Sequence, residues 1–91
     1  MKVRKSVVVT GRVQGVAFRN YTLMTAVSLG VKGWVRNLPT GEVEGCFEGE
    51  EGDVLELVDW CRRGPSAVRV DSLLEREGTH TGEFCSFEIR Y

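Results

Sequence analysis

Residues 11–19, with the sequence GRVQGVAFR, combine a flexible main chain with a cation at the end of the segment. Gly15 has no Cβ and lets the main chain curl with a positive φ angle. Main-chain N–H groups that point inward from such a turn form a nest for an anion, and the dipole of a following helix adds to it. Arg19 supplies a planar guanidinium that can bind two phosphate oxygens at once. The segment therefore predicts a phosphate cradle closed by one arginine.

The same residues have a simpler interpretation. Glycine turns between a strand and a helix are common, and an arginine at a helix start is often only solvated. Taken alone, the segment fits this interpretation better than it fits a binding site.

A second polar residue, Asn37, stands in the segment GWVRNLPTG near the end of a predicted strand. Its amide offers both a donor and an acceptor, and it could hold a water molecule against a phosphorus atom fixed by the cradle. The alternative is that Asn37 only forms the turn before Leu38 and Pro39.

The elements that must position these residues follow from the hydrophobic pattern. Strands are expected over residues 3–10, 31–39, 42–50, 68–77 and 84–91, and helices over residues 19–29 and 53–63. The order is β-α-β-β-α-β plus a short C-terminal strand. Two crossover helices on one face of an antiparallel sheet give an α+β fold, the ferredoxin-like split β-α-β sandwich.

Length and charge limit the class of protein. We expect the 91 residues to form a single domain over residues 1–91. A net charge of −1 argues against a broad surface for nucleic acid or anionic lipid. The first apolar run is too short for a signal peptide, and no run is long enough to span a membrane. We expect a cytoplasmic monomer.

The residues that commonly bind metals are few. Cys46, Cys61 and Cys85 show no CxxC spacing, and His80 is the single histidine, so no metal site, disulfide framework or catalytic triad is expected. We expect Cys61 in the core, His80 at the surface, and Cys46 on the open side of the sheet without a basic neighbour that would make it reactive.

Both motifs together give the sequence a strong resemblance to the acylphosphatases. The family pattern is G-x-V-Q-G-V-x-F-R followed, after the first helix, by G-W-V-x-N, and this chain has GRVQGVAFR and GWVRN. The C-terminal FEIRY and the Gly-Pro pair after the second helix also match. The resemblance extends from Val7 to Tyr91.

The resemblance implies metal-independent hydrolysis of the carboxyl-phosphate bond of a small-molecule acyl phosphate, without a cofactor. It implies that Arg19 binds the phosphate and Asn37 orients the attacking water. The main chain that would form the phosphate-binding loop belongs to Gln14, Gly15, Val16, Ala17, Phe18 and Arg19. Because the leaving group is a carboxylate, positioning and charge suffice and no strong general acid is needed. Ala17 departs from the glycine that many members have there.

Two other functions share this topology. A non-catalytic module that binds phosphate or an acyl phosphate would need Arg19 and the cradle but hardly Asn37. An RNA-binding domain would need an aromatic and basic third strand, whereas residues 42–50 (EVEGCFEGE) are acidic. The enzyme is the favoured interpretation.

Two further expectations concern contacts. The resemblance suggests that the C-terminal carboxylate of Tyr91 pairs with Arg19 when the site is empty. Leu23, Met24 and Val27 are expected on the outer side of the first helix, as scattered surface residues or as a weak self-association patch.

Overall fold

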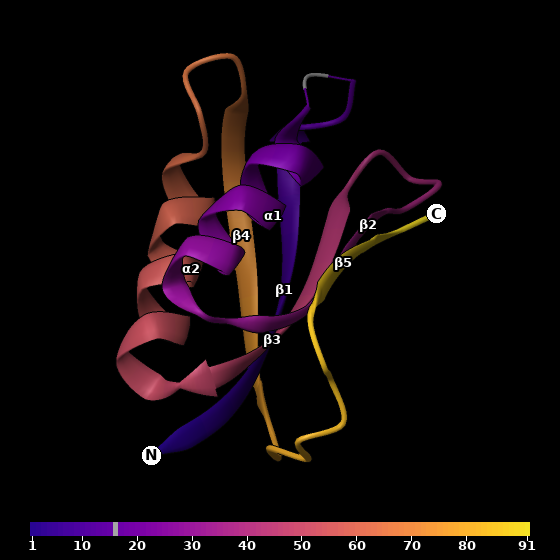
Figure 1. The fold of residues 1–91 in the computed structure, drawn as a ribbon. Coiled ribbons are helices and arrows are strands. Elements are labelled where there is room, and N and C mark those ends of the chain that lie inside the picture. Colours follow the sequence, from indigo (N-terminus) through magenta and orange to yellow (C-terminus); the bar gives the residue numbers. More distant parts are fainter. Residues whose placement is uncertain (16) are drawn as a thin grey trace.

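The computed structural model describes residues 1–15 and 17–91, and these form two helices packed on one face of a five-stranded sheet (Figure 1). The elements are β1 (Lys2–Arg12), α1 (Phe18–Leu29), β2 (Lys32–Asn37), β3 (Val43–Glu50), α2 (Glu51–Arg63), β4 (Arg69–Gly78) and β5 (Phe87–Arg90). Their order confirms the predicted ferredoxin-like fold with a short last strand.

The sheet is mixed, so the prediction of an antiparallel sheet was wrong at one edge. The strand order is β4-β1-β3-β2-β5, and β5 pairs with β2 in parallel while the other three pairs are antiparallel. The chain leaves β4 at one edge and crosses the end of the sheet through residues 79–86 (Figure 1). β5 therefore starts at that end and runs in the direction of β2.

Most element boundaries differ from those predicted by one to three residues, and two of these differences have a clear structural cause. β1 continues beyond Thr10 because a bulge at Thr10/Gly11 lets the strand follow β4 as far as the pair Arg12–Arg69. At Gly11 a Cβ atom would lie 2.1 Å from the carbonyl oxygen of Arg69, so this position requires glycine. α2 begins at Glu51 rather than Asp53, because β3 leads directly into it at Glu50.

The core lies between the sheet and the helices. On α1 it takes Phe18, Thr22 and Ala26, which are spaced as one face of a helix requires. The largest other apolar side chains that are fully buried come from β1, β2, β3 and α2, and they include Val9, Val35, Phe47, Val54 and Leu57. Cys61 is also in this core, where burial raises the pKa of its thiol to about 12. The prediction for Cys61 is confirmed.

The outer side of α1 is less apolar than predicted. Leu23 packs against the core, whereas Met24 and Val27 are more than 60% exposed. The three residues therefore do not form one continuous stripe. Among the residues that the structure describes, no helix has the length and apolar character needed to cross a membrane.

α1 begins after an unusual residue. Ala17 has φ 61° and ψ 23°, and among the described residues it is the single non-glycine residue with a positive φ. Its carbonyl accepts the hydrogen bond of Tyr21 N at 3.1 Å, which closes the first helical turn. The left-handed conformation brings Cβ close to the main chain and costs an L-residue about 1–2 kcal/mol. The helix ends at Gly30, which also has a positive φ.

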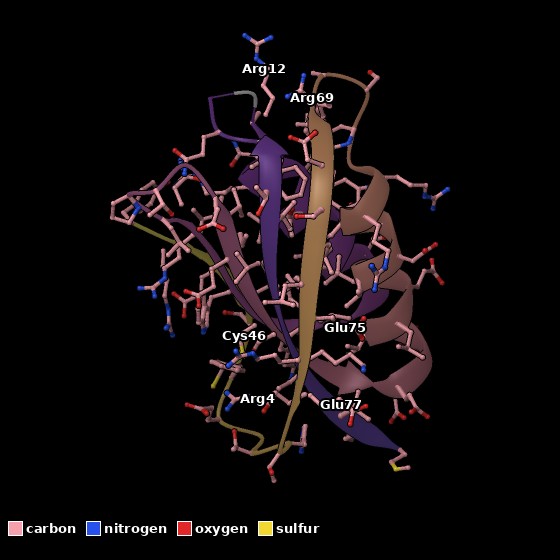
Figure 2. The ribbon with its side chains drawn as sticks, turned by 180° about the vertical axis from the view of Figure 1, so that it is seen from behind. Arg4, Arg12, Cys46, Arg69, Glu75 and Glu77 are labelled. Carbon is pink, nitrogen blue, oxygen red and sulfur yellow. The ribbon has the colours of Figure 1, made fainter. Side chains whose placement is uncertain are left out.

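Cys46 lies on the open face of the sheet, the face without helices, as Figure 2 shows. The prediction that it lacks a basic neighbour was wrong, because Arg4 on β1 lies beside it. Burial is nevertheless the larger effect and raises the pKa of the Cys46 thiol. The thiol is therefore protonated at neutral pH and not reactive.

A buried carboxylate on the same face holds the crossing loop. Glu48 is 3% exposed and accepts hydrogen bonds from the main chain of Thr81 (2.9 Å) and Gly82 (3.1 Å), and the Nε atom of Arg4 lies 3.0 Å away. His80, which was expected at the surface, is partly exposed and lies 3.7 Å from this carboxylate. Burial raises the pKa of Glu48, but these hydrogen bonds and the charge of Arg4 outweigh it, so the pKa lies below its ordinary value of 4.5.

We predict that Ala17→Gly stabilises the protein by about 0.5–1 kcal/mol, because the relieved strain exceeds the entropy that glycine adds to the unfolded chain. Urea unfolding measures this free energy. Ala67, in an exposed turn without a positive φ, supplies the matched control. Ala67→Gly should lose stability, and a loss in both variants would show that Ala17 is not strained.

We predict that Glu48→Gln lowers the free energy of unfolding at pH 7 by about 2 kcal/mol, because hydrogen bonds to a charged acceptor are weakened. A carboxylate with a lowered folded-state pKa contributes stability that is fully present above its unfolded pKa and is lost as the pH falls. The parent should therefore lose more stability than the variant between about pH 5 and pH 3.

Urea unfolding across this pH range tests both statements. Glu56→Gln, which changes an exposed glutamate of α2, is the control and should behave as the parent does. If the parent and Glu48→Gln lost the same unfolding free energy as the pH falls, the assignment of this pH dependence to Glu48 would be contradicted.

Candidate active site

A small cavity lies where the β1–α1 loop, the end of β2 and the C-terminus meet, at the end of the sheet away from the N-terminus (Figure 1). Its volume is about 110 Å³, several times what one water molecule requires. The lining includes Gly15, Ala17, Phe18, Arg19, Asn37 and Tyr91. The fold therefore brings together the two segments that the sequence singled out.

Arg19 reaches the cavity from the first turn of α1 and is half-buried. Its guanidinium carbon lies 5.1 Å from the centroid of the Tyr91 ring, in a cation–π contact. The ion pairs formed within residues 1–15 and 17–91 include none with Arg19. The N–H groups of the guanidinium are thus not engaged by a carboxylate.

The expected pair between Arg19 and the carboxylate of Tyr91 is not formed. Side chains alternate along β5, so Tyr91 points to the same side as Ile89, which also lines the cavity. This alternation brings the ring, rather than the terminal carboxylate, to Arg19.

Asn37 is the last residue of β2 and lies on the helix-covered side, two positions after the buried Val35. Its Oδ1 atom is buried and has no hydrogen-bond partner among the described residues. An unsatisfied buried acceptor costs about 1–3 kcal/mol. Because this acceptor belongs to a residue that lines the cavity, a molecule bound there can satisfy it.

The main chain around the cavity suits an anion. Gly15 (φ 77°) and Ala17 (φ 61°) both adopt the left-handed conformation. α1 has no side-chain hydrogen bond at its N-cap and no acidic residue in its first turn, so side chains do not satisfy its first N–H groups. These groups and the helix dipole favour a negative charge. Val16, also predicted for the loop, lies outside the described residues.

Two predicted loop residues have side chains engaged elsewhere. Phe18 is buried in the core, with its ring centroid 5.7 Å from that of Trp60, so only its main chain faces the cavity. The Gln14 side chain is directed to the β2–β3 turn, where its amide donates hydrogen bonds to the carbonyls of Leu38 and Glu42, both at 2.8 Å. Gln14 is not among the lining residues.

Sequence reasoning missed three lining residues, the apolar Val13 and Ile89 and the polar Asn20. Asn20 follows Arg19 directly on α1, and its place in the first turn of a helix without a side-chain cap is the signal that could have found it. Among the described lining residues, Arg19 has the single charged side chain.

Comparisons with known proteins agree with this geometry. The sequence profile of the acylphosphatase family matches residues 5–89. An acylphosphatase of Geotalea uraniireducens is 56% identical over 91 residues, which cover 100% of both chains, and one of Geobacter metallireducens is 53% identical over all of this chain and 98% of its own.

The solved structures give the same result. The crystal structure of acylphosphatase from Bacillus subtilis superimposes with a TM-score of 0.93 at 31% identity, over 98% of this chain and 99% of that one. The fold, the cavity and these relatives agree, and the chain belongs to the acylphosphatase family.

Proposed function

We propose that this acylphosphatase hydrolyses small acyl phosphates in the cavity between α1 and β2, with Arg19 and the loop main chain holding the phosphoryl group and Asn37 orienting the attacking water. Family membership supports the reaction, and the geometry supports these residue roles.

The unsatisfied Oδ1 atom of Asn37 is the observation that carries the proposal. A site that only binds phosphate needs donors, because the phosphate oxygens are themselves acceptors. This acceptor belongs to a residue that lines the cavity, and it suits a water molecule, which donates one hydrogen to Oδ1 and directs an oxygen lone pair elsewhere. A module that only binds the dianion of an acyl phosphate, which carries no O–H group, has no use for that acceptor.

Arg19 and the N–H groups at the start of α1 neutralise the charge of the phosphoryl oxygens, and positioning with charge stabilisation is most of what phosphoryl transfer requires. The water oxygen forms a bond to phosphorus while the bond between phosphorus and the acyl oxygen breaks. The electron pair of the broken bond leaves with the carboxylate. A proton of the water passes to a phosphoryl oxygen, so the products are a carboxylate and inorganic phosphate.

The remaining proposals concern the protein as a whole. Arg19, Asn37 and the loop are all the groups that the proposed reaction uses, so the site needs no second copy and we propose a monomer. The two helices and the sheet share one core, which supports one domain over residues 1–91. The net charge of −1 supports a free small molecule, rather than a nucleic acid, as the substrate.

The test is phosphate release from benzoyl phosphate in the presence of EDTA. Arg19→Ala should lower kcat/KM by about 10²–10³ and also weaken inhibition by inorganic phosphate, because it removes a charged donor. Asn37→Ala should lower kcat by about 10² while the inhibition constant of phosphate stays within about twofold of the parent value.

Arg12→Ala is the matched control. Arg12 is the other arginine of the segment, and it is exposed and points away from the molecule (Figure 2). Its variant should keep parental kinetics. Parental kcat in Asn37→Ala would contradict the water-orienting role, and undiminished phosphate inhibition in Arg19→Ala would contradict the binding role.

A further inference from the structure

We infer that Gln14 is a positioning residue, whose side-chain amide sets the distance between the phosphate loop and Asn37. This inference rests on the proposed roles of the loop and of Asn37. Gln14 then does not contact the substrate. Its side chain links one half of the site, the phosphate loop, to the other half, Asn37.

The two halves of the site stand on strands that are not neighbours. The loop follows β1 and Asn37 ends β2, and β3 lies between these strands in the sheet. Neighbouring strands are about 4.8 Å apart, so the ends of β1 and β2 are about 10 Å apart. Something must therefore fix the loop with respect to the end of β2.

The hydrogen bonds of Gln14 lie where such a link is needed. Leu38 directly follows Asn37, and Glu42 directly precedes Val43, the residue that pairs with Asn37 across β2 and β3. By donating to the carbonyls of Leu38 and Glu42, both at 2.8 Å, Gln14 binds the turn one residue after Asn37 and one residue before Val43. On its other side, Gln14 directly precedes Gly15, which lines the cavity.

These bonds leave the amide nitrogen no hydrogen for a substrate. The side chain has two N–H hydrogens, and the two carbonyls take both of them. The same carbonyls also accept the turn's own hydrogen bonds, from Gly41 N at 3.1 Å and Leu38 N at 2.8 Å. These hydrogen bonds close the β2–β3 turn, and the side chain of Gln14 attaches the closed turn to the β1–α1 loop.

A second contact joins β1 to the same turn and offers a comparison. Thr10 Oγ1 donates to the Glu42 side chain at 3.2 Å. This bond is longer and ends on a side chain with several rotatable bonds, so it holds the main chain of the turn weakly. If Gln14 fixes Asn37, the loss of the Thr10 bond should matter much less than the loss of the Gln14 bonds.

Gln14→Met, which keeps the length of the side chain without its N–H donors, tests the inference with benzoyl phosphate and inorganic phosphate. We expect kcat to fall about tenfold, because small displacements of a reacting group are costly, while the inhibition constant of phosphate stays within about twofold. Thr10→Val should leave both values within about twofold of the parent. Urea unfolding checks that each variant is folded, and Gln14→Glu, of the same shape and without N–H donors, replaces Gln14→Met if that variant does not fold.

A double variant separates positioning of Asn37 from a general structural effect. In the Asn37→Ala background, Gln14→Met should change the residual kcat by less than about twofold, because the amide that it positions is gone. A tenfold fall in both backgrounds would overturn the inference. So would an unchanged kcat in Gln14→Met, or a fall in kcat matched by an equal loss of phosphate affinity.

The same variants give a different result if the proposed role of Asn37 is wrong. Parental kcat in Asn37→Ala alone removes the role of Asn37 and, with it, the inference. A strongly reduced kcat in Asn37→Ala, together with independent effects of Gln14→Met, removes the inference and leaves the role of Asn37 in place.

Discussion

No side chain caps the N-terminus of α1, and the rest of the site depends on this constraint. A helix leaves its first N–H groups without partners inside the helix, and here neither an N-cap side chain nor an acidic first turn compensates. The left-handed Ala17 adds strain at the same point. The uncapped helix end and the strained Ala17 therefore lower the stability of the protein at this position, and a bound anion would offset this loss.

The fold places the remaining groups around that helix end. The topology β4-β1-β3-β2-β5 puts the ends of β1, β2 and β5 at one end of the sheet, so Arg19, Asn37 and Tyr91 converge from three distant parts of the chain. Stability is built at the opposite end, where Glu48 holds the crossing loop through main-chain hydrogen bonds. An end held by the hydrogen bonds of Glu48 and an end with a strained residue and an uncapped helix therefore share one sheet.

The sequence predicted the element order and the two site segments because these depend on local signals. The alternation of apolar residues marks the strands, and the α1 pattern of Phe18, Thr22 and Ala26 marks its buried face. The direction of β5 was not predictable in this way, because it depends on which end of the sheet the loop over residues 79–86 crosses.

Within the site, the residue types were predictable and the directions of their side chains were not. The turn carbonyls that engage Gln14 are 24 and 28 residues away in sequence, so no local pattern indicates them. The ring of Tyr91, the residue directly after β5, lies against Arg19, whereas the resemblance had suggested the carboxylate. Likewise, Arg4 lies beside Cys46 only through the pairing of β1 with β3.

The central claim is that a water molecule held in this cavity attacks phosphorus rather than the acyl carbon. Hydrolysis of benzoyl phosphate in ¹⁸O-labelled water, followed by mass spectrometry of both products, tests it directly. We predict that the label enters inorganic phosphate and is absent from benzoate. Label in benzoate would mean attack at the carbonyl carbon and would contradict the roles assigned to the cradle and to Asn37.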